Sequence, residues 1–200
     1  MPQAKIAGGL CYLCSSRVGP GHIHHLDYGK VEFGAYSPDM QDELAAILEE
    51  FKKAGIPAEL AADLKTARWK KLFWNIPFNG LTVALNTSTE QIMACPRASE
   101  LSRALMCEVL AGARACGCTA IGESYIGQMM AFTRKMKPYK PSMRLDFEAR
   151  RPLETEYLYR RPLAAARRAG AALPRIEMLA AELEFLDGQN RKEKQDRASG

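Results

Sequence analysis

The chain has 200 residues, of which 47% are hydrophobic and 26% are charged, and its formal net charge is +5. This composition is typical of a globular protein with one ordinary domain, or with a helical domain and a smaller appendage. No window reaches the roughly 18 apolar residues that a membrane-spanning helix needs. The mild basic excess comes without a nucleic-acid-binding motif or a clustered basic face. We therefore expect neither a membrane nor a nucleic acid as a partner.

The six cysteines do not form a convincing metal site. Cys11 and Cys14 form a C-x-x-C pair on a predicted strand, where side chains three apart point to opposite faces and chelate poorly. Cys116 and Cys118 have no second pair at zinc-finger spacing. The opening residues lack the basic start and small-residue cleavage site of a signal peptide. We expect reduced thiols, a cytoplasmic protein and no metal.

The first 36 residues predict short strands. The runs "GLCYLCSS", "HIHHLDYG" and "KVEFGAY" are separated by Gly-Pro-Gly and Tyr-Gly, which we interpret as turns. A helix is predicted next, with Ser37 as its N-cap, Pro38 at its first position and Gly55 at its end. "IPAELAAD" then reads as a link. Three strands without helices between them resemble the edge of a larger sheet, and such an edge favours pairing with a partner.

The remaining chain predicts helices. Their expected ranges are about 63–86, 88–94, 96–117, 124–136, 152–169 and 174–188, and "KPYKPSM" interrupts the pattern. The predicted fold class is therefore mainly α with a short β segment. We divide the chain into a β-containing segment at 1–61, an all-α domain at 62–190 and a disordered tail at 191–200.

A polar stripe runs along the helix predicted between 68 and 86. At about 100° per residue, its polar side chains share an arc of roughly 80°. They are Arg68, Lys71, Asn75, Asn79, Thr82 and Asn86. The rest of the circumference is almost entirely apolar, so we expect a buried helix with one polar seam. Pro77 removes a backbone donor and should distort this helix.

The seam has two interpretations. Buried amide and ammonium groups cost several kcal/mol unless they are paired, so the stripe indicates either a ligand or bonds to neighbouring helices. A small anion that carries carbonyl or hydroxyl groups would suit lysine and asparagine. The acidic partner would come from "PSMRLDFEARRPLETE", which contains Ser142 and Glu154. Local ion pairs and helix N-termini also explain the acids of this segment.

The segments "WKKLFWNIPFNGLTVALN" and "SMRLDFEARRPLETEYL" together resemble the C-terminal domain of the ketopantoate reductase (2-dehydropantoate 2-reductase) family. The shared patterns are W-x-K-L-x-x-N-x-x-x-N, Ser-Met-x-x-Asp and a late Gly-x-x-x-Pro. "GPGHIHHLDYGKVEFGAY" is similar to the strands that end the family's Rossmann domain. The resemblance implies a helical domain like the C-terminal domain of 6-phosphogluconate dehydrogenase, after a β segment left from an incomplete Rossmann domain.

The resemblance also implies an activity, the reduction by NADPH of a 2-keto acid such as ketopantoate. Lys71 aligns with the general acid of the family, which protonates the developing alkoxide. Asn75 and Asn79 align with the amides that hold the substrate, and Ser142 aligns with the hydroxyl at the polar end of the substrate. Glu154 aligns with the acid that orients the lysine, the substrate and the cofactor.

The sequence departs from the family pattern in several places. It contains no G-x-G-x-x-G, the phosphate-binding motif of a Rossmann domain. Leu153 replaces a threonine of the family, and Tyr159 with Arg160 replaces Asn-Gly, which leaves the identity of the keto acid open. Ser15, by contrast, corresponds roughly to the position where the family backbone meets the nicotinamide. We expect a homodimer or pairing with a separate nucleotide-binding half. The alternative is a non-catalytic helical dimerisation module of the same descent.

Overall fold

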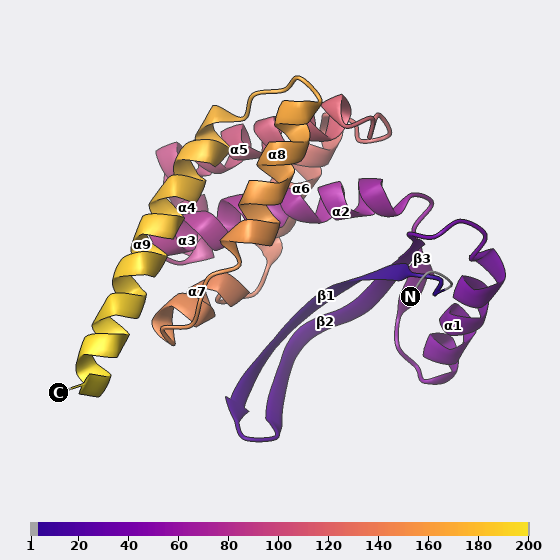
Figure 1. Ribbon diagram of the computed structural model, residues 1–200, viewed down its shortest axis with the longest axis horizontal. Helices are drawn as coiled ribbons and strands as arrows, with labels where there is room; N and C mark the ends of the chain where they lie inside the picture. The colour runs from indigo at the N-terminus through magenta and orange to yellow at the C-terminus, as the bar shows by residue number, and fades with distance from the viewer. Residues whose placement is uncertain (1–3, 200) are drawn as a thin grey trace. The chain divides into compact units, whose positions relative to one another are not determined.

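The computed structural model describes the backbone of residues 4–199 and the side chains through Glu193 (Figure 1). The chain divides into two compact units, Met1–Arg68 and Trp69–Gly200, with the division inside helix α2 (Leu64–Trp74). Contacts alone do not test the functional division expected at 61/62, which stays a prediction. Across residues 4–199, no helix is both long enough and apolar enough to cross a bilayer.

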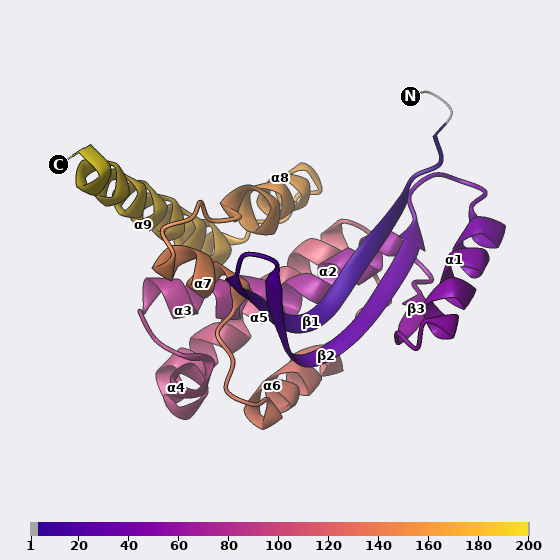
Figure 2. The same ribbon diagram turned by 90° about the horizontal axis from the view of Figure 1, so that it is seen from below.

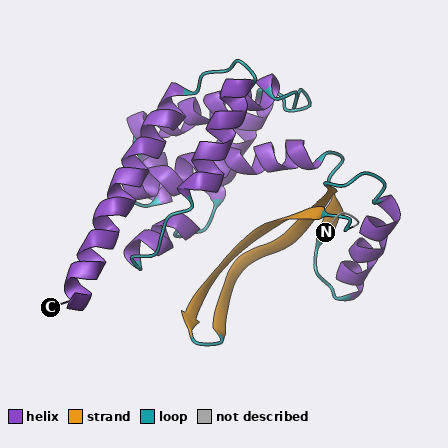
Figure 3. Cartoon of the chain, in the orientation of Figure 1, coloured by secondary structure: helices purple, strands orange, loops and turns teal. Residues whose placement is uncertain are grey.

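The first unit is built on a three-stranded sheet in the order β1-β2-β3 (Figure 3). Strands β1 (Ala7–Gly19) and β2 (His22–Ala35) form an antiparallel hairpin, and β3 (Ala58–Leu60) pairs in parallel with β2. Helix α1 (Gln41–Lys53) connects β2 to β3. The turn predicted at Gly-Pro-Gly is confirmed at the hairpin tip, where Gly21 adopts a φ of 69°.

Three predictions for this unit are wrong. The runs "HIHHLDYG" and "KVEFGAY" belong to one strand, because Tyr28 (φ 62°) and Gly29 (φ 139°) form an irregularity inside β2 and do not reverse the chain. The segment "IPAELAAD", expected to be a link, contains the third strand, β3, which was missed because three residues are too few to show a period of two. Helix α1 has Met40 as its N-cap, since the Ser37 hydroxyl accepts a hydrogen bond from the Ile6 amide instead.

The second unit is helical and confirms the mainly α fold class. Its elements after α2 are η1 (Asn75–Asn79), α3 (Gly80–Ala84), α4 (Thr89–Ala94), α5 (Pro96–Ala115), α6 (Ser124–Lys135), α7 (Ser142–Glu148), η2 (Glu156–Arg160), α8 (Arg161–Arg168) and α9 (Pro174–Ser199). Segments η1 and η2 are single π-helical turns. Because α2, η1 and α3 follow one another without a break, they form one rod, which we call the central rod.

The helix ends have local causes that the sequence largely revealed. Ser88 and Gln91 form a reciprocal capping box at the start of α4, and Pro96 begins α5 at a position where a missing N–H costs nothing. Helix α7 was not predicted, because seven residues show too little periodicity. The backbone of 191–199 continues helix α9, whereas a disordered tail was expected. Since the side chains of 194–200 lie outside the described residues, disorder of the tail stays a prediction.

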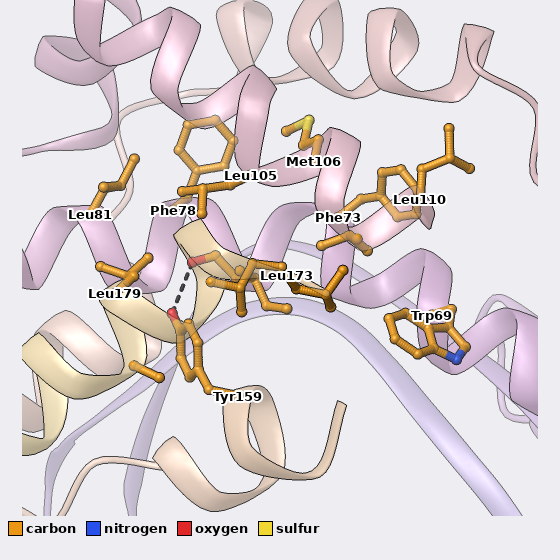
Figure 4. Packing of buried hydrophobic residues seen from close by; sticks show 14 of the residues in the cluster. Trp69, Phe73, Phe78, Leu81, Leu105, Met106, Leu110, Tyr159, Leu173 and Leu179 are labelled. Carbon is orange, nitrogen blue, oxygen red and sulfur yellow. Dashed lines mark hydrogen bonds between the residues drawn. The ribbon is translucent and has the colours of Figure 1, made fainter. Parts of the chain in front are cut away.

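The central rod is buried along most of its girth, as its apolar pattern predicts. Phe73, Ile76 and Phe78 have no exposed surface. Figure 4 shows the rod packed against side chains of α5 and α9. Those labelled there from α5 and α9 are Leu105, Met106, Leu110 and Leu179. The interior of the second unit is therefore organised around this one helix.

Gly80 of the rod packs tightly against Tyr159 of η2. A Cβ atom on Gly80 would lie 2.5 Å from the Tyr159 hydroxyl oxygen and 2.7 Å from a methyl carbon of Leu179. The Tyr159 hydroxyl donates a hydrogen bond of 2.8 Å to the carbonyl oxygen of Ile76 (Figure 4). Burial raises the pKa of Tyr159 far above its ordinary value, which keeps the phenol protonated as a donor. The bulk of Tyr159 thus lies in the core of the second unit.

We predict that Gly80→Ala destabilises the protein by about 1–3 kcal/mol, because the added methyl group overpacks a site with no free space. Gly127→Ala is the matched control, since a Cβ at Gly127 on α6 meets nothing within 4 Å. The control should raise the unfolding free energy by about 0.5–1 kcal/mol through helix propensity. Urea denaturation measures both changes. Equal stability of the Gly80→Ala variant and the wild type would contradict this packing.

Candidate active site

The polar stripe lies on the central rod where the rod changes from α- to π-helical geometry. Residues 75–79 form the π turn, and Pro77 lies inside it. In an i→i+5 turn each residue advances by about 80° instead of about 100°. Asn79 therefore turns back toward the line of Lys71 and Asn75, whereas a regular α-helix would carry it further away. The distortion expected at Pro77 thus straightens the stripe.

Asn79 joins the rod to α7. Its side chain is 2% exposed, and its Oδ1 accepts a hydrogen bond of 3.1 Å from the backbone amide of Met143. The Ser142 hydroxyl lies 3.5 Å from the same oxygen, which is the length of a weak bond. The structure therefore brings together two of the predicted site residues, Asn79 and Ser142, from segments far apart in sequence.

Arg144 is a second tie between α7 and the rod, and sequence reasoning missed it. Its guanidinium donates 3.0 Å to the carbonyl oxygen of Thr82, and it also pairs with Glu148 at 2.8 Å. Thr82 itself is fully buried, and its hydroxyl donates to the carbonyl of Phe78 within the rod. The end of the stripe at Thr82 is therefore structural. The sequence shows Arg144 four residues before Glu148, a spacing that predicts their local ion pair but not the bond from Arg144 to Thr82.

Lys71 and Asn75 occupy the other end of the stripe and are half-buried. They stand one helical turn apart, so their side chains lie on the same face of the rod. The Asn75 side chain makes no hydrogen bond to another residue of the described part of the chain. An ammonium and an amide, neither fully solvated nor fully enclosed, therefore lie next to each other at this end of the stripe.

Glu154 is exposed, in the segment that leads into η2. Its backbone is held on both sides, since Leu153 is buried and donates its amide to Asp187 at 3.3 Å, while the amide of Leu158 donates to the Glu154 carbonyl at 3.2 Å. Its carboxylate makes no hydrogen bond or ion pair within the described residues. The structure thus anchors the Glu154 backbone without joining its carboxylate to the stripe.

Ser15 belongs to the first unit. It is half-buried on β1, directly after an irregularity in the pairing with β2, opposite His25. The Cys11 and Cys14 side chains of the same strand are exposed and buried respectively, as expected for opposite faces, and none of the six cysteines, which all lie within the described residues, forms a disulfide. Within the described residues, no group of three or more His, Cys, Asp or Glu side chains could hold a metal ion.

Comparison with known proteins shows the family to which this chain belongs. The family described as "Ketopantoate reductase PanE/ApbA C terminal" matches residues 63–187, which include α2 and most of the second unit. The chain belongs to the ketopantoate reductase family. The resemblance predicted from the sequence is therefore confirmed.

Individual relatives agree with the family. A 2-dehydropantoate 2-reductase of Nostoc sp. is 47% identical over 196 residues, which cover 96% of this chain and 61% of the relative. The crystal structure of 2-dehydropantoate 2-reductase from Geobacter metallireducens superposes with a TM-score of 0.87 at 44% identity, over 90% of this chain and 60% of that one. The crystal structure of 2-dehydropantoate 2-reductase from Methylococcus capsulatus superposes with a TM-score of 0.86 at 33% identity, over 94% of this chain and 60% of that one. This chain thus spans about three fifths of their lengths.

We predict that Asn79→Ala and Asn75→Ala separate the two ends of the stripe. Asn79→Ala should lower the unfolding free energy by about 1–3 kcal/mol, because the buried Met143 amide loses its acceptor. Asn75→Ala, the matched control, should change it by less than about 0.5 kcal/mol. Urea denaturation followed by circular dichroism measures both. If the two variants lose equal stability, the division into a structural end and an open end is wrong.

Proposed function

We propose that this chain supplies the catalytic helical half of an NADPH-dependent reductase of 2-keto acids, with ketopantoate or a close relative as substrate. The observation that carries the proposal is the half-buried polar pair Lys71 and Asn75, which stands directly before the buried segment 76–83 of the rod. The names of relatives up to 47% identical support the reaction type. Those relatives are longer than this chain, so the activity of a whole protein is part of the proposal.

In the proposed reaction Lys71 is the general acid. As a hydride reaches the carbonyl carbon of the keto acid, the electron pair of the C=O bond moves to oxygen. The Lys71 ammonium stabilises this oxyanion and donates a proton to it, which leaves a hydroxyl group on the product and a neutral lysine. The lysine then regains a proton from water. The half-buried position supports this role, because an ammonium interacts more strongly with an oxyanion away from bulk water.

The amides and the hydroxyl would hold the keto acid in place. Asn75 can both donate and accept, so it suits a ligand that carries carboxylate and hydroxyl groups. Asn79 already accepts from Met143 through Oδ1, which leaves its amino group to donate. Ser142 stands at the first position of α7 beside Asn79. We propose that Glu154 orients the lysine and the bound substrate, which would require its carboxylate to turn toward them.

The cofactor would be held only in part by these residues. NADPH supplies the hydride when it is bound. The 200 residues contain no G-x-G-x-x-G loop for its pyrophosphate, so this chain does not fit the whole dinucleotide by itself. Ser15 and Glu154 are the proposed contacts near the nicotinamide end. The proposal therefore includes a nucleotide-binding half as partner, because a homodimer, the other partner expected, would still lack that loop.

Replacement of Lys71 tests the proposed role. The chain would be joined to the part of the Nostoc relative that it does not match, and NADPH oxidation with ketopantoate would be followed by absorbance. Lys71→Gln should lower kcat by a factor of about 10²–10⁴, because general acid catalysis is lost. Lys70→Gln removes the same charge from the neighbouring position and should leave kcat nearly unchanged.

Three results would contradict the proposal. Full turnover by Lys71→Gln would remove the lysine from the chemistry. An active joined enzyme in which both lysine variants lose the same activity would indicate a general effect of charge. If the joined protein with wild-type Lys71 folds, dimerises and binds NADPH without turnover, the non-catalytic dimerisation module becomes the better description.

A further inference from the structure

Glu154 stands at the end of the connection between α7 and η2, and three side chains of α9 bind that connection. We call them the brace; they are Asp187, Asn190 and Glu193. Figure 2 shows α7 and the segment that follows it beside α9. Because the three residues are spaced three apart, each is the neighbour of the next on the helix surface. Helix α9 also packs against α3 of the central rod and against η2, so it is a common support for these elements.

Asp187 holds the backbone directly before Glu154. It is 5% exposed; one of its carboxylate oxygens accepts the Leu153 amide at 3.3 Å, and the other pairs with Arg191 at 2.9 Å. Leu153 is buried, so its amide needs a partner inside the protein, and Asp187 supplies it. With this backbone held, the direction of the Glu154 carboxylate depends mainly on the torsions of its own side chain.

Asn190 binds the end of α7. Its Nδ2 donates to the carbonyl oxygen of Phe147 at 2.7 Å, and the amide of Arg150 donates to the same oxygen at 3.0 Å. The amide of Arg151 donates to the carbonyl oxygen of Asp146 at 2.8 Å, so α7 ends in a Schellman motif. The end of α7 is thus closed by its own backbone and joined to α9.

Glu193 binds the residue that occupies the glycine position of this motif. That residue is Arg150, whose φ of 52° is a left-handed conformation that strains a residue with a Cβ atom. Its guanidinium pairs with Glu193 at 2.9 Å. A glycine would relieve the strain but would remove the ion pair. The residue present therefore sacrifices local stability for a bond to α9.

We propose that the brace residues are positioning residues for Glu154. They hold the backbone of the connection in one place, so that only the Glu154 side chain turns when it meets Lys71 and the substrate. This role rests on the proposed function, in which Glu154 orients the lysine and the substrate. Asn190 and Glu193 lie beyond residue 187, where the family match ends, so the brace extends past the matched region.

Hydrogen exchange of the full chain, followed by mass spectrometry of peptides that cover residues 147–158, tests the brace without an assay of activity. Asn190→Ala and Glu193→Gln should each speed exchange in this segment by about threefold or more, because each removes a bond that limits local opening. These two variants are used because loss of the Asp187 carboxylate would also leave the buried Leu153 amide without its partner.

Gln189→Ala is the matched control for Asn190→Ala. It removes an amide from the preceding, exposed residue of α9, which makes no hydrogen bond or ion pair within the described residues. Exchange in the segment 147–158 should then stay as in the wild type. Unchanged exchange in both brace variants, or an equal increase in the control, would overturn the proposal.

A double-mutant cycle in the joined reductase tests whether the brace acts through Glu154. Asn190→Ala should lower kcat/KM for the keto acid by about threefold or more, and should cause no further loss when Glu154→Gln is also present. A general loss of stability would instead lower kcat/KM equally in both backgrounds, which would overturn the positioning role. So would full activity of Glu154→Gln alone. Full turnover by Lys71→Gln, by contrast, contradicts the reductase mechanism and leaves the exchange result unaffected.

Discussion

A proline in the middle of a buried helix is the constraint on which this structure depends. Pro77 cannot donate a backbone hydrogen bond, so the central rod takes one π turn around it. The carbonyl of Ile76, within that turn, accepts the hydroxyl of Tyr159 from the second π turn. The two irregular segments are thereby fastened to each other in the core, and π turns of this kind occur frequently at functional sites.

The same two turns position the candidate catalytic groups. Asn75 and Asn79 begin and end the first turn, Lys71 stands one turn before it, and Glu154 precedes the second. These groups differ in how the fold uses them. Asn79 is tied into the packing of α7, whereas Lys71 and Asn75 remain partly open. Such a site combines a rigid support with a few accessible polar atoms, which suits the recognition of a small molecule.

Local signals in the sequence were sufficient for most helix ends and for the buried rod. Pro96, Ser88 and the apolar periodicity act through neighbouring residues, so a linear sequence reveals them. The Tyr-Gly pair of β2 was wrongly predicted to be a turn, because residues with a left-handed backbone conformation occur at irregularities inside strands as well as in turns. The burial of Tyr159 was not predicted for another reason, since its position depends on the space beside Gly80, which belongs to a remote segment.

The candidate site shows the same limit. The i, i+4 spacing predicted the shared face of Lys71 and Asn75, but regular geometry did not predict the π turn that keeps Asn79 near their line. The bonds from Met143 to Asn79 and from Arg144 to Thr82 join segments that no periodicity connects. Such contacts follow only from the tertiary packing of α7 on the rod.

The close fit of Gly80 against Tyr159 also restricts how this chain can evolve. A side chain at position 80 has no room while the phenol is present, and a smaller residue at 159 would open a void and abandon the Ile76 carbonyl. Mutations at these two positions should therefore be epistatic. A lineage that exchanges the tyrosine for a short polar residue can accept a larger residue at 80 only if the Leu179 side chain also moves aside, so the order of the replacements determines whether the intermediate folds.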